Sequence, residues 1–287
     1  MPQYIGRFAP TPTGPLHFGS LVAALASYLD AKSHNGTWLL RIEDLDPPRE
    51  DKAASELIPK QLLEHGLQWD GEIEFQSQHS SRYEHYLEKL RNLELLFPCT
   101  CSRKNLASNK GLHLGNCHSS TNDPHAWRLS VPNDTYSFID RVYGENSQSL
   151  AEVGDQVLKR KDGLYAYQLA VVVDDYESSI SHVVRGLDLL DNTPRQLYLM
   201  QCLGIKTPSY LHIPLITNDS GQKLSKQNQA QALNLNTIED NLLKAMTFLK
   251  QPPVPLESQQ DSQSILKWAI QNWQVSEVPS LKAGLIP

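Results

Sequence analysis

The order of elements at the start of the chain constrains the fold more than any other feature of the sequence. Residues 4–8 have the composition of a short strand, and the proline- and glycine-rich stretch 9–15 ends it. In residues 18–29 the apolar side chains recur at the spacing of a helix. The first turn of such a helix offers backbone N–H groups and a positive dipole end, so we expect a phosphate site near His17 and Gly19. On these residues alone, an ordinary βα turn with a chance histidine is the alternative.

Three of the four cysteines lie close together and indicate a metal site. Cys99 and Cys101 form a Cys-x-Cys pair, and after eleven intervening residues His113 and Cys117 form a His-x-x-x-Cys pair. Two thiolates from one turn and two ligands from another suit tetrahedral zinc. His118 is a competing ligand, but neighbouring residues rarely both reach one ion, so we expect His113 to bind. Free cysteines in a polar insertion are the alternative.

Two motifs far apart in the chain indicate one class of nucleotide-binding enzyme. The first consists of RFAPTPTG, which begins at Arg7, and HFGS, which begins at His17; the second is KLSK, which begins at Lys223. On its own the KLSK stretch fits a solvated basic loop, but it follows the last expected strand. Together with Glu43, these motifs resemble the class I aminoacyl-tRNA synthetases of the glutamate branch. The resemblance covers roughly residues 5–226 and extends to the small glutamyl-queuosine tRNA(Asp) synthetases, which resemble the catalytic part of glutamyl-tRNA synthetase without its anticodon-binding domains.

The resemblance implies a fold class and an arrangement of domains. The expected fold is α/β, a Rossmann-like parallel sheet with a zinc-bearing insertion and a short helical C-terminal segment. The expected boundaries are 1–97 for the first half of the nucleotide-binding domain, 98–150 for the RNA-facing zinc insertion, 151–232 for the second half with the KLSK loop, and 233–287 for the helical segment. Relatives usually carry tyrosine where this chain has His113. Because imidazole is the better zinc ligand, this difference strengthens the zinc site.

The resemblance also implies an activity. It is the ATP-dependent, tRNA-independent activation of L-glutamate to glutamyl-AMP, followed by transfer of glutamate to the queuosine base in the anticodon of tRNA(Asp). Mg²⁺ would accompany ATP, and one structural Zn²⁺ is expected per chain. Two other hypotheses stay open: a discrete glutamyl-tRNA synthetase core that charges the 3′ end of tRNA, and a non-catalytic RNA-binding paralogue. The intact motifs disfavour the paralogue, because a decayed site would lose such costly charges first.

Candidate site residues follow from the motif positions. The residues expected to be catalytic are His17, Lys223 and Lys226. Those expected to bind ATP are His17, Gly19, Ser20, Lys223, Ser225 and Lys226. Those expected to bind glutamate are Arg7, Phe8, Ala9, Pro10, Thr11, Glu43, Tyr167 and Arg185. Those expected to hold zinc are Cys99, Cys101, His113 and Cys117.

Three of the expected glutamate-binding residues take specific roles from the resemblance. Glu43 matches the carboxylate that contacts the amino group of glutamate, and Tyr167 matches a hydroxyl contact. Arg185 matches the clamp on the substrate side chain, for which a guanidinium fork suits a carboxylate in bidentate fashion. Judged from the residues alone, Glu43 also fits a solvated turn, and Arg185 also fits a rim arginine paired with Asp188 or Asp191.

Hydrophobic periodicity predicts the remaining elements. Strands are expected at residues 38–42, 126–131, 136–139, 156–160, 164–168, 169–175, 180–186 and 210–216. Helices are expected at residues 53–66, 82–97, 191–204, 238–249 and 263–273. The longest clean apolar run lies within 169–175, which we expect to be a buried parallel strand.

Charge and hydropathy narrow the partners and the compartment. The formal net charge of −6 disfavours unspecific binding to nucleic acid, although short basic runs at 103–104 and 159–161 are candidates for a local RNA-facing surface. Neither a signal peptide nor an apolar stretch of the ~20 residues that span a bilayer is visible. We therefore expect a cytoplasmic protein without a membrane partner, and we expect a monomer.

Overall fold

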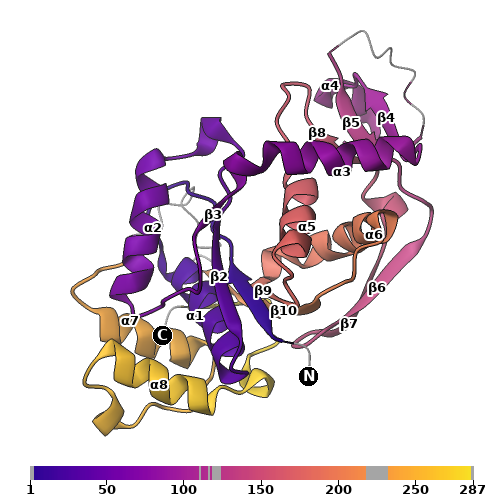
Figure 1. The fold of residues 1–287 in the computed structure, drawn as a ribbon. Helices are drawn as coiled ribbons and strands as arrows, with labels where there is room; N and C mark the ends of the chain where they lie inside the picture. Colours follow the sequence, from indigo (N-terminus) through magenta and orange to yellow (C-terminus); the bar gives the residue numbers. More distant parts are fainter. Residues whose placement is uncertain (1–2, 110, 116, 118–123, 218–231, 286–287) are drawn as a thin grey trace.

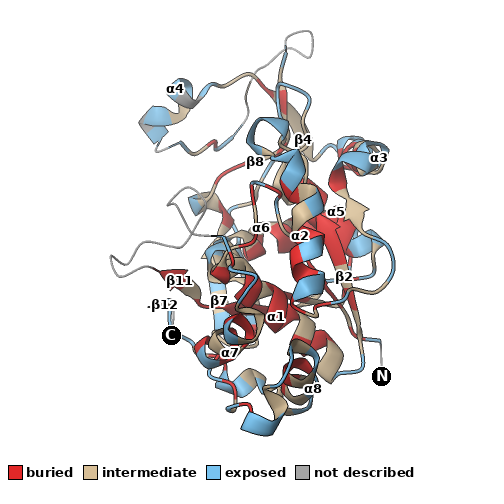
Figure 2. Cartoon of the chain, turned by 90° about the vertical axis from the view of Figure 1, so that its left-hand side faces the viewer, coloured by how far each residue is buried: buried red, intermediate tan, exposed pale blue. Residues whose placement is uncertain are grey.

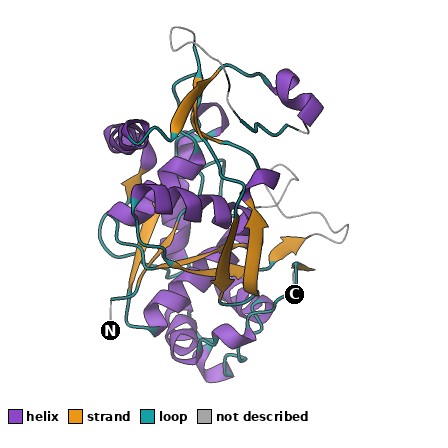
Figure 3. Ribbon diagram, turned by 90° about the vertical axis from the view of Figure 1, so that its right-hand side faces the viewer, coloured by secondary structure: helices purple, strands orange, loops and turns teal. Residues whose placement is uncertain are grey.

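The computed structural model describes residues 3–109, 111–115, 117, 124–217 and 232–285. Strands run through the middle of the molecule, and helices lie on either side of them (Figure 1, Figure 3). In the described ranges, no helix combines the length and the apolar character needed to cross a lipid bilayer.

Two largely parallel sheets lie side by side at the centre. The first has the order β1–β2–β3 and consists of β1 (Ile5–Phe8), β2 (Thr37–Ile42) and β3 (Glu74–Phe75). The second has the order β9–β10–β6–β7 and consists of β9 (His182–Gly186), β10 (Ser209–Ile213), β6 (Thr135–Asp140) and β7 (Gly144–Ser149). All of these pairs are parallel except β6 with β7. β1 contacts β9, and the backbone N–H of Ser181 donates to the carbonyl of Ile5 at 2.9 Å, so the sheets continue one another.

The helices pack into two apolar cores. One core joins β1 and β2 to α1 (Phe18–Ser33), α2 (Lys52–Glu64), α7 (Ile238–Phe248) and α8 (Ser262–Asn272). The other joins β9 and β10 to α3 (Ser80–Asn92), α5 (Tyr167–Glu177) and α6 (Thr193–Leu203). Figure 2 shows the buried faces of α1 and α5 at the centre of the molecule. Val183 and Tyr210 belong to one core and their strand neighbours Val184 and Leu211 to the other, so the two cores lie on opposite faces of the sheet.

Local signals explain where several helices begin and end. The side chain of Asp51 accepts a hydrogen bond from the first turn of α2, and Asp261 does the same for α8. Gly204 ends α6 in the left-handed conformation, with φ of 69°, which glycine adopts without steric cost.

A smaller antiparallel sheet lies at the opposite end of the molecule from α7 and α8 (Figure 1). It consists of β4 (Leu96–Cys99), β5 (Ala126–Leu129) and β8 (Gln156–Lys159). The short helix α4 (Arg103–Leu106) projects from the body next to it (Figure 2). Near the C-terminus, β11 (Leu215–Thr217) pairs with β12 (Ala283–Leu285). In the part of the chain that the structure describes, the 3₁₀ turns are η1 (Pro47–Arg49), η2 (Gln76–His79), η3 (Ala107–Asn109), η4 (Leu150–Glu152), η5 (Leu187–Asn192), η7 (Leu256–Ser258) and η8 (Val275–Glu277).

The strand expected at residues 169–175 is wrong, because this segment belongs to the helix α5. Residues 169–173 are each at most 2% exposed, so this stretch of the helix is apolar on every side. A helix buried all round lacks the 3.6-residue alternation that separates a helix from a buried strand. The strand expected at 164–168 is also wrong: Tyr165 makes a single bridge to Lys159, and α5 begins two residues later.

Two other boundaries differ from the sequence prediction. The helix expected at 82–97 ends at Asn92, since Glu94 has φ of 58° and leaves the helical conformation. Pro98 lies within β4, which is an edge strand, where a residue without an N–H group is tolerated. The strand expected at 210–216 is divided by Pro214 into β10 and β11. The other expected helices and strands are confirmed to within a few residues.

Candidate active site

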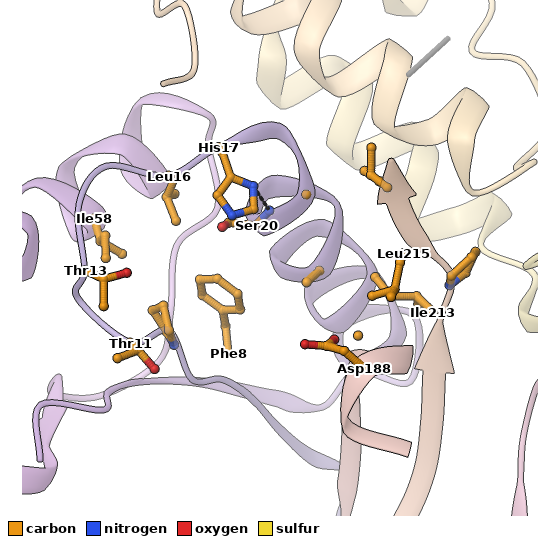
Figure 4. Close-up of a pocket in the computed structure, with 16 residues that line it drawn as sticks. Phe8, Thr11, Thr13, Leu16, His17, Ser20, Ile58, Asp188, Ile213 and Leu215 are labelled. Carbon is orange, nitrogen blue, oxygen red and sulfur yellow. Dashed lines mark hydrogen bonds between the residues drawn. The ribbon is translucent and has the colours of Figure 1, made fainter. Parts of the chain in front are cut away.

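A cavity of about 470 Å³ opens where β1 ends and α1 begins (Figure 4). The predicted site residues that line it are Phe8, Pro10, Thr11, His17, Gly19 and Ser20. Asp188, which follows β9, and Leu215 of β11 face them from the other side (Figure 4). The order of strands reverses between β1 and β9, and ligands of open α/β sheets bind at the carboxyl ends of the strands at such a reversal.

His17 is the N-cap of α1. Its Nδ1 accepts a hydrogen bond from the backbone N–H of Ser20 at 3.3 Å, so in the neutral ring the proton lies on Nε2. The N-terminus of a 16-residue helix thus lies at the cavity wall, and its dipole favours an anion there. This is the position at which the sequence predicts phosphate binding.

A second cavity of about 490 Å³ adjoins the first. Four of the residues expected to bind glutamate line it, namely Ala9, Thr11, Glu43 and Tyr167. Thr11 and Asp188 line both cavities, so the expected amino-acid space and the expected phosphate space share a wall. Residues 9–11, 43 and 167 are far apart in the chain, and the fold brings them together at the ends of β1 and β2 and at the start of α5.

Arg7 and Arg41 share one buried carboxylate. Nε and Nη2 of Arg7 donate to the two oxygens of Asp175 at 3.0 and 3.3 Å, and Nη2 of Arg41 donates to the same carboxylate at 2.6 Å. Burial raises the pKa of Asp175, but the two guanidinium groups outweigh it and hold that pKa below its ordinary range. Arg7 itself lies behind the cavity residues and lines neither cavity.

Glu43 is a buried carboxylate on the wall of the second cavity. Burial raises its pKa to about 7, although Arg41 and Arg7 act in the opposite direction. The nearest oxygen of Glu43 lies 3.7 Å from Nη2 of Arg41. A cation in the cavity would keep this carboxylate ionised at neutral pH, and the ammonium group of an amino acid is such a cation.

Arg185 is buried and its direct partners are uncharged. Its Nε donates to Nε2 of His212 at 3.0 Å and its Nη1 to the amide oxygen of Gln196 at 2.9 Å. Its Nη2 donates to the hydroxyl of Thr193 at 2.8 Å and to the carbonyl of Leu189 at 3.3 Å. None of these partners is a carboxylate, so the guanidinium keeps its charge for a ligand. A bidentate ligand would displace some of these contacts, because they already use four of the five N–H groups.

The charge of Arg185 reaches the second cavity through Tyr167. Arg185 is not among the residues that line either cavity, whereas Gly186 and Asp188 beside it line the first. Burial raises the pKa of Tyr167, and the positive charge of Arg185 opposes that rise. The guanidinium is thus close enough to act on the tyrosine that faces the amino-acid space.

Several predicted and unpredicted residues complete the description of the site. Lys223, Ser225 and Lys226 lie outside the described residues. Sequence reasoning missed Asp175, because the segment that carries it was expected to be a strand. It also missed the contact between Arg185 and His212, for which the only available signal was that both lie on expected strands.

The four expected zinc ligands form one cluster. The ligand atoms of Cys99, Cys101, His113 and Cys117 all lie within 4.8 Å of one another, and the sulfurs of Cys101 and Cys117 are 3.5 Å apart. Burial, together with the neighbouring thiols, raises the pKa of Cys101 to about 11. A bound cation would reverse this by stabilising thiolates, and three sulfurs with one imidazole suit zinc. The donor set therefore fits the ion, while His118 lies outside the described residues.

Asp155 orients the histidine of this cluster. Nδ1 of His113 lies 2.7 Å from a carboxylate oxygen of Asp155, which leaves Nε2 of the imidazole for an ion. The other oxygen of Asp155 accepts the backbone N–H of Val131 at 3.0 Å. A carboxylate behind a ligating histidine fixes the tautomer and direction of the ring.

Comparison with known proteins agrees with this geometry. Residues 5–251 match the family described as tRNA synthetases class I (E and Q), catalytic domain. A Glutamyl-Q tRNA(Asp) synthetase from Pseudomonas fluorescens is 50% identical over 281 residues, which cover 96% of this chain and 94% of the relative. A Neisseria meningitidis relative of the same name is 47% identical over 290 residues, with 96% and 98% coverage. The chain belongs to this family. It is therefore a ligase of the aminoacyl-tRNA synthetase type.

Solved structures confirm the fold. A glutamate tRNA ligase from Elizabethkingia meningosepticum, solved in complex with its amino acid, superposes with a TM-score of 0.85 at 22% identity, covering 99% of this chain and 67% of that chain. A glutamate-tRNA synthetase from Elizabethkingia anophelis gives 0.82 at 23% identity. The expected α/β fold with a parallel sheet and a Cys₃His cluster is thus confirmed.

Proposed function

We propose that this ligase activates L-glutamate with ATP to form glutamyl-AMP without RNA, and then transfers the glutamyl group to the queuosine base in the anticodon of tRNA(Asp). The observation that carries this proposal is the shared wall of the two cavities at Thr11 and Asp188. Adenylate formation needs the α-carboxylate of the amino acid next to the α-phosphate of ATP. Adjoining cavities, one at a helix N-terminus and one beside Glu43, suit that requirement.

The cavity residues support an assignment of roles. In the first cavity, His17, Gly19 and Ser20 at the start of α1 would bind the phosphates of ATP. In the second, Glu43 would bind the ammonium group and Tyr167 would contact the substrate through its hydroxyl. Arg185 would attract the side-chain carboxylate. Arg7 would act from behind, through the backbone around Phe8, Ala9 and Pro10, because its guanidinium is already held by Asp175.

The proposed chemistry requires no nucleophile from the protein. An oxygen of the α-carboxylate attacks the α-phosphorus, the bond to the bridging oxygen breaks, and pyrophosphate leaves. A hydroxyl of the modified base then attacks the acyl carbon, and AMP leaves. Positioning and charge stabilisation would supply the rate: Mg²⁺ bound with ATP would offset phosphate charge, and Lys223, Ser225 and Lys226 would meet the charge of the leaving group. We therefore expect Lys226→Ala to abolish exchange of pyrophosphate into ATP.

The relatives favour the queuosine base over the 3′ end of tRNA as the acceptor. This chain covers 94% and 98% of the two relatives named Glutamyl-Q tRNA(Asp) synthetase, but only 67% of the glutamate tRNA ligase that shares its fold. The likeness to that ligase makes charging of a tRNA 3′ end the second candidate. We propose that the enzyme acts as a monomer in the cytoplasm, where its tRNA substrate is available.

The deciding experiment offers labelled glutamate and ATP to purified tRNA(Asp) with and without queuosine. We expect label only on the queuosine-containing tRNA, and we expect it to persist when the 3′-terminal adenosine has been removed. Label that requires the terminal adenosine, or that appears on tRNA(Glu), would establish the second candidate. Activation of glutamate without transfer to any tRNA would contradict the proposed acceptor.

The Cys₃His cluster gives a separate test on the RNA side of the molecule. We propose that it holds one structural zinc that fixes the segment around α4, which lies apart from the two cavities. Metal analysis should therefore give about one zinc per chain. Removal of the zinc should impair transfer to tRNA more than RNA-independent exchange. A folded, fully active and metal-free protein would contradict this role.

A further inference from the structure

A buried relay of side chains lies behind Arg185. Nε of Arg185 donates to Nε2 of His212 at 3.0 Å, and Nδ1 of His212 lies 2.7 Å from a carboxylate oxygen of Asp140. The side chains of His212 and Asp140 are both 0% exposed. The three residues come from the adjacent strands β9, β10 and β6, and His212 is the direct register partner of Arg185. The sheet register therefore builds this relay.

The hydrogen-bond chemistry of the relay allows one arrangement of protons. A guanidinium can only donate, so Nε2 of His212 must be the acceptor and its ring proton must lie on Nδ1. That N–H then donates to Asp140. Burial lowers the pKa of His212, which keeps the ring neutral. Burial raises the pKa of Asp140, but the hydrogen bonds from His212, Tyr143 and Val142 outweigh it and keep the carboxylate ionised.

The relay separates the charge of Arg185 from its counterion. A carboxylate in direct contact with the guanidinium would occupy the same fork that a substrate carboxylate needs, as Asp175 does for Arg7. Here a neutral imidazole stands between the two charges. It orients the Nε edge of the guanidinium, while the Nη groups keep only neutral partners from Thr193, Gln196 and Leu189.

We propose that Asp140 and His212 are positioning residues that aim Arg185 at the side-chain carboxylate of glutamate and so set the selectivity for an acidic amino acid. The role of Arg185 in this scheme rests on the function proposed above. Asp140 lies within the 98–150 segment, so that segment would contribute to amino-acid recognition through the central sheet as well as to RNA binding.

The test is steady-state pyrophosphate exchange on the full chain, with the KM for glutamate, the KM for ATP and kcat measured separately. In Asp140→Asn an amide N–H₂ replaces an accepting oxygen, either opposite His212 or opposite the backbone N–H groups of Val142 and Tyr143. Opposite His212, it would force the ring proton onto Nε2, against Arg185. We expect the KM for glutamate to rise about tenfold or more, with the KM for ATP and kcat changed less than about threefold. Either orientation removes the negative charge of Asp140 and breaks part of its hydrogen-bond set, so an unchanged KM for glutamate in a folded variant would overturn the proposal.

Graded substitutions at His212 protect the test against a variant that fails to fold. His212→Gln places an amide oxygen where Nε2 lies and an amide N–H₂ toward Asp140, whereas His212→Leu offers neither. We expect the KM for glutamate to increase in the order wild type, His212→Gln, His212→Leu. Equal values for the two variants would contradict an orienting role.

A double-mutant cycle distinguishes positioning from general stability. In an Arg185→Gln background, Asp140→Asn should change the KM for glutamate less than about twofold, because the group that it aims is gone. The matched control is Asp30→Asn, which removes another buried carboxylate, bonded to Arg141 and Trp273 instead. Its effect should be the same in both backgrounds. If Asp140→Asn raises the KM for glutamate by the same factor with and without Arg185, the proposed relay is overturned. A wild-type KM in Arg185→Gln alone would instead overturn the role of Arg185 in the proposed function.

Discussion

Arg7 and Arg185 are buried arginines on neighbouring strands, but only Arg7 contacts a carboxylate directly. Arg7, on β1, shares with Arg41 a carboxylate from Asp175 that bonds both of them directly. Arg185, on β9, bonds only neutral groups, and its counterion Asp140 is one imidazole away. Both Arg7 and Arg185 thus have hydrogen-bond partners in a space where an unpaired charge would be costly, whereas Nε and Nη1 of Arg41 have none among the described residues.

Direct contact with a carboxylate gives Arg7 a structural role, whereas the absence of such a contact leaves Arg185 able to bind a ligand. Hydrogen bonds to Asp175 hold β1, β2 and α5 together, and the negative charge of Asp175 opposes the effect of Arg7 on the pKa of Tyr167. Of the two arginines, Arg185 has the larger effect on the pKa of this tyrosine, which lies on the wall of the second cavity. Burial and hydrogen bonding alone do not tell the two arginines apart; the charge of their partners does.

The largest effect should follow from removing the carboxylate of the first arrangement. Asp175→Asn leaves Arg7 and Arg41 buried with Glu43 and Asp174 as the remaining nearby carboxylates. Breaking a buried ion pair in this way costs about 3–5 kcal/mol of unfolding free energy. Denaturant unfolding of the variant should show this loss. Asp162→Asn, which breaks an exposed pair with Arg160, should cost less than about 1 kcal/mol. Equal losses of unfolding free energy in Asp175→Asn and Asp162→Asn would contradict the structural role of Asp175.

Substitution of Arg185 should reduce activity strongly and stability only moderately. Arg185→Gln removes the charge but leaves Asp140 bonded to His212, so unfolding free energy should fall less than in Asp175→Asn. Losing a buried carboxylate contact costs about 2–3 kcal/mol in binding, so kcat/KM for glutamate in the exchange reaction should fall roughly 100-fold. Arg195→Gln, a neighbouring partly buried arginine bonded to the carbonyl of Val153, is the control and should leave kcat/KM unchanged.

Glu43 lies between the two arrangements and should give the smallest effect, seen as a dependence on pH. Its pKa is raised from 4.5 to about 7 in the folded protein. Its contribution to stability is therefore fully present below pH 4.5 and is lost as the pH rises through 7. Ammonium binding needs the ionised form, which falls from about one half at pH 7 to about one eleventh at pH 6, so the KM for glutamate should rise about fivefold over this range. Glu43→Gln should have a raised KM that does not change over this range. A flat profile in the wild type would exclude Glu43 as the ammonium partner.

The extent to which the sequence predicts this structure depends on how local each feature is. The N-terminal strand, loop and helix and the Cys₃His cluster follow from short spacings, and the fold places His17, Gly19 and Ser20 at one cavity as expected. The segment 169–175 was not predictable as a helix, because burial on all sides removes its periodicity. Asp175, the partner of Arg7, and His212, the partner of Arg185 on the next strand, are each more than 25 residues away in the chain. Their pairing depends on sheet order and register, which no single stretch of sequence specifies.

The most direct measurement of the central claim is exchange of labelled pyrophosphate into ATP without RNA, compared for glutamate and glutamine at equal concentrations. The two amino acids differ only in the group that Arg185 is proposed to recognise. The wild-type enzyme should support exchange with glutamate, with a kcat/KM roughly 100-fold above that for glutamine, and Arg185→Gln should narrow that ratio to a few-fold. Absence of glutamate-dependent exchange, or equal exchange with glutamine in the wild type, would contradict the claim that the charge of Arg185 selects the substrate.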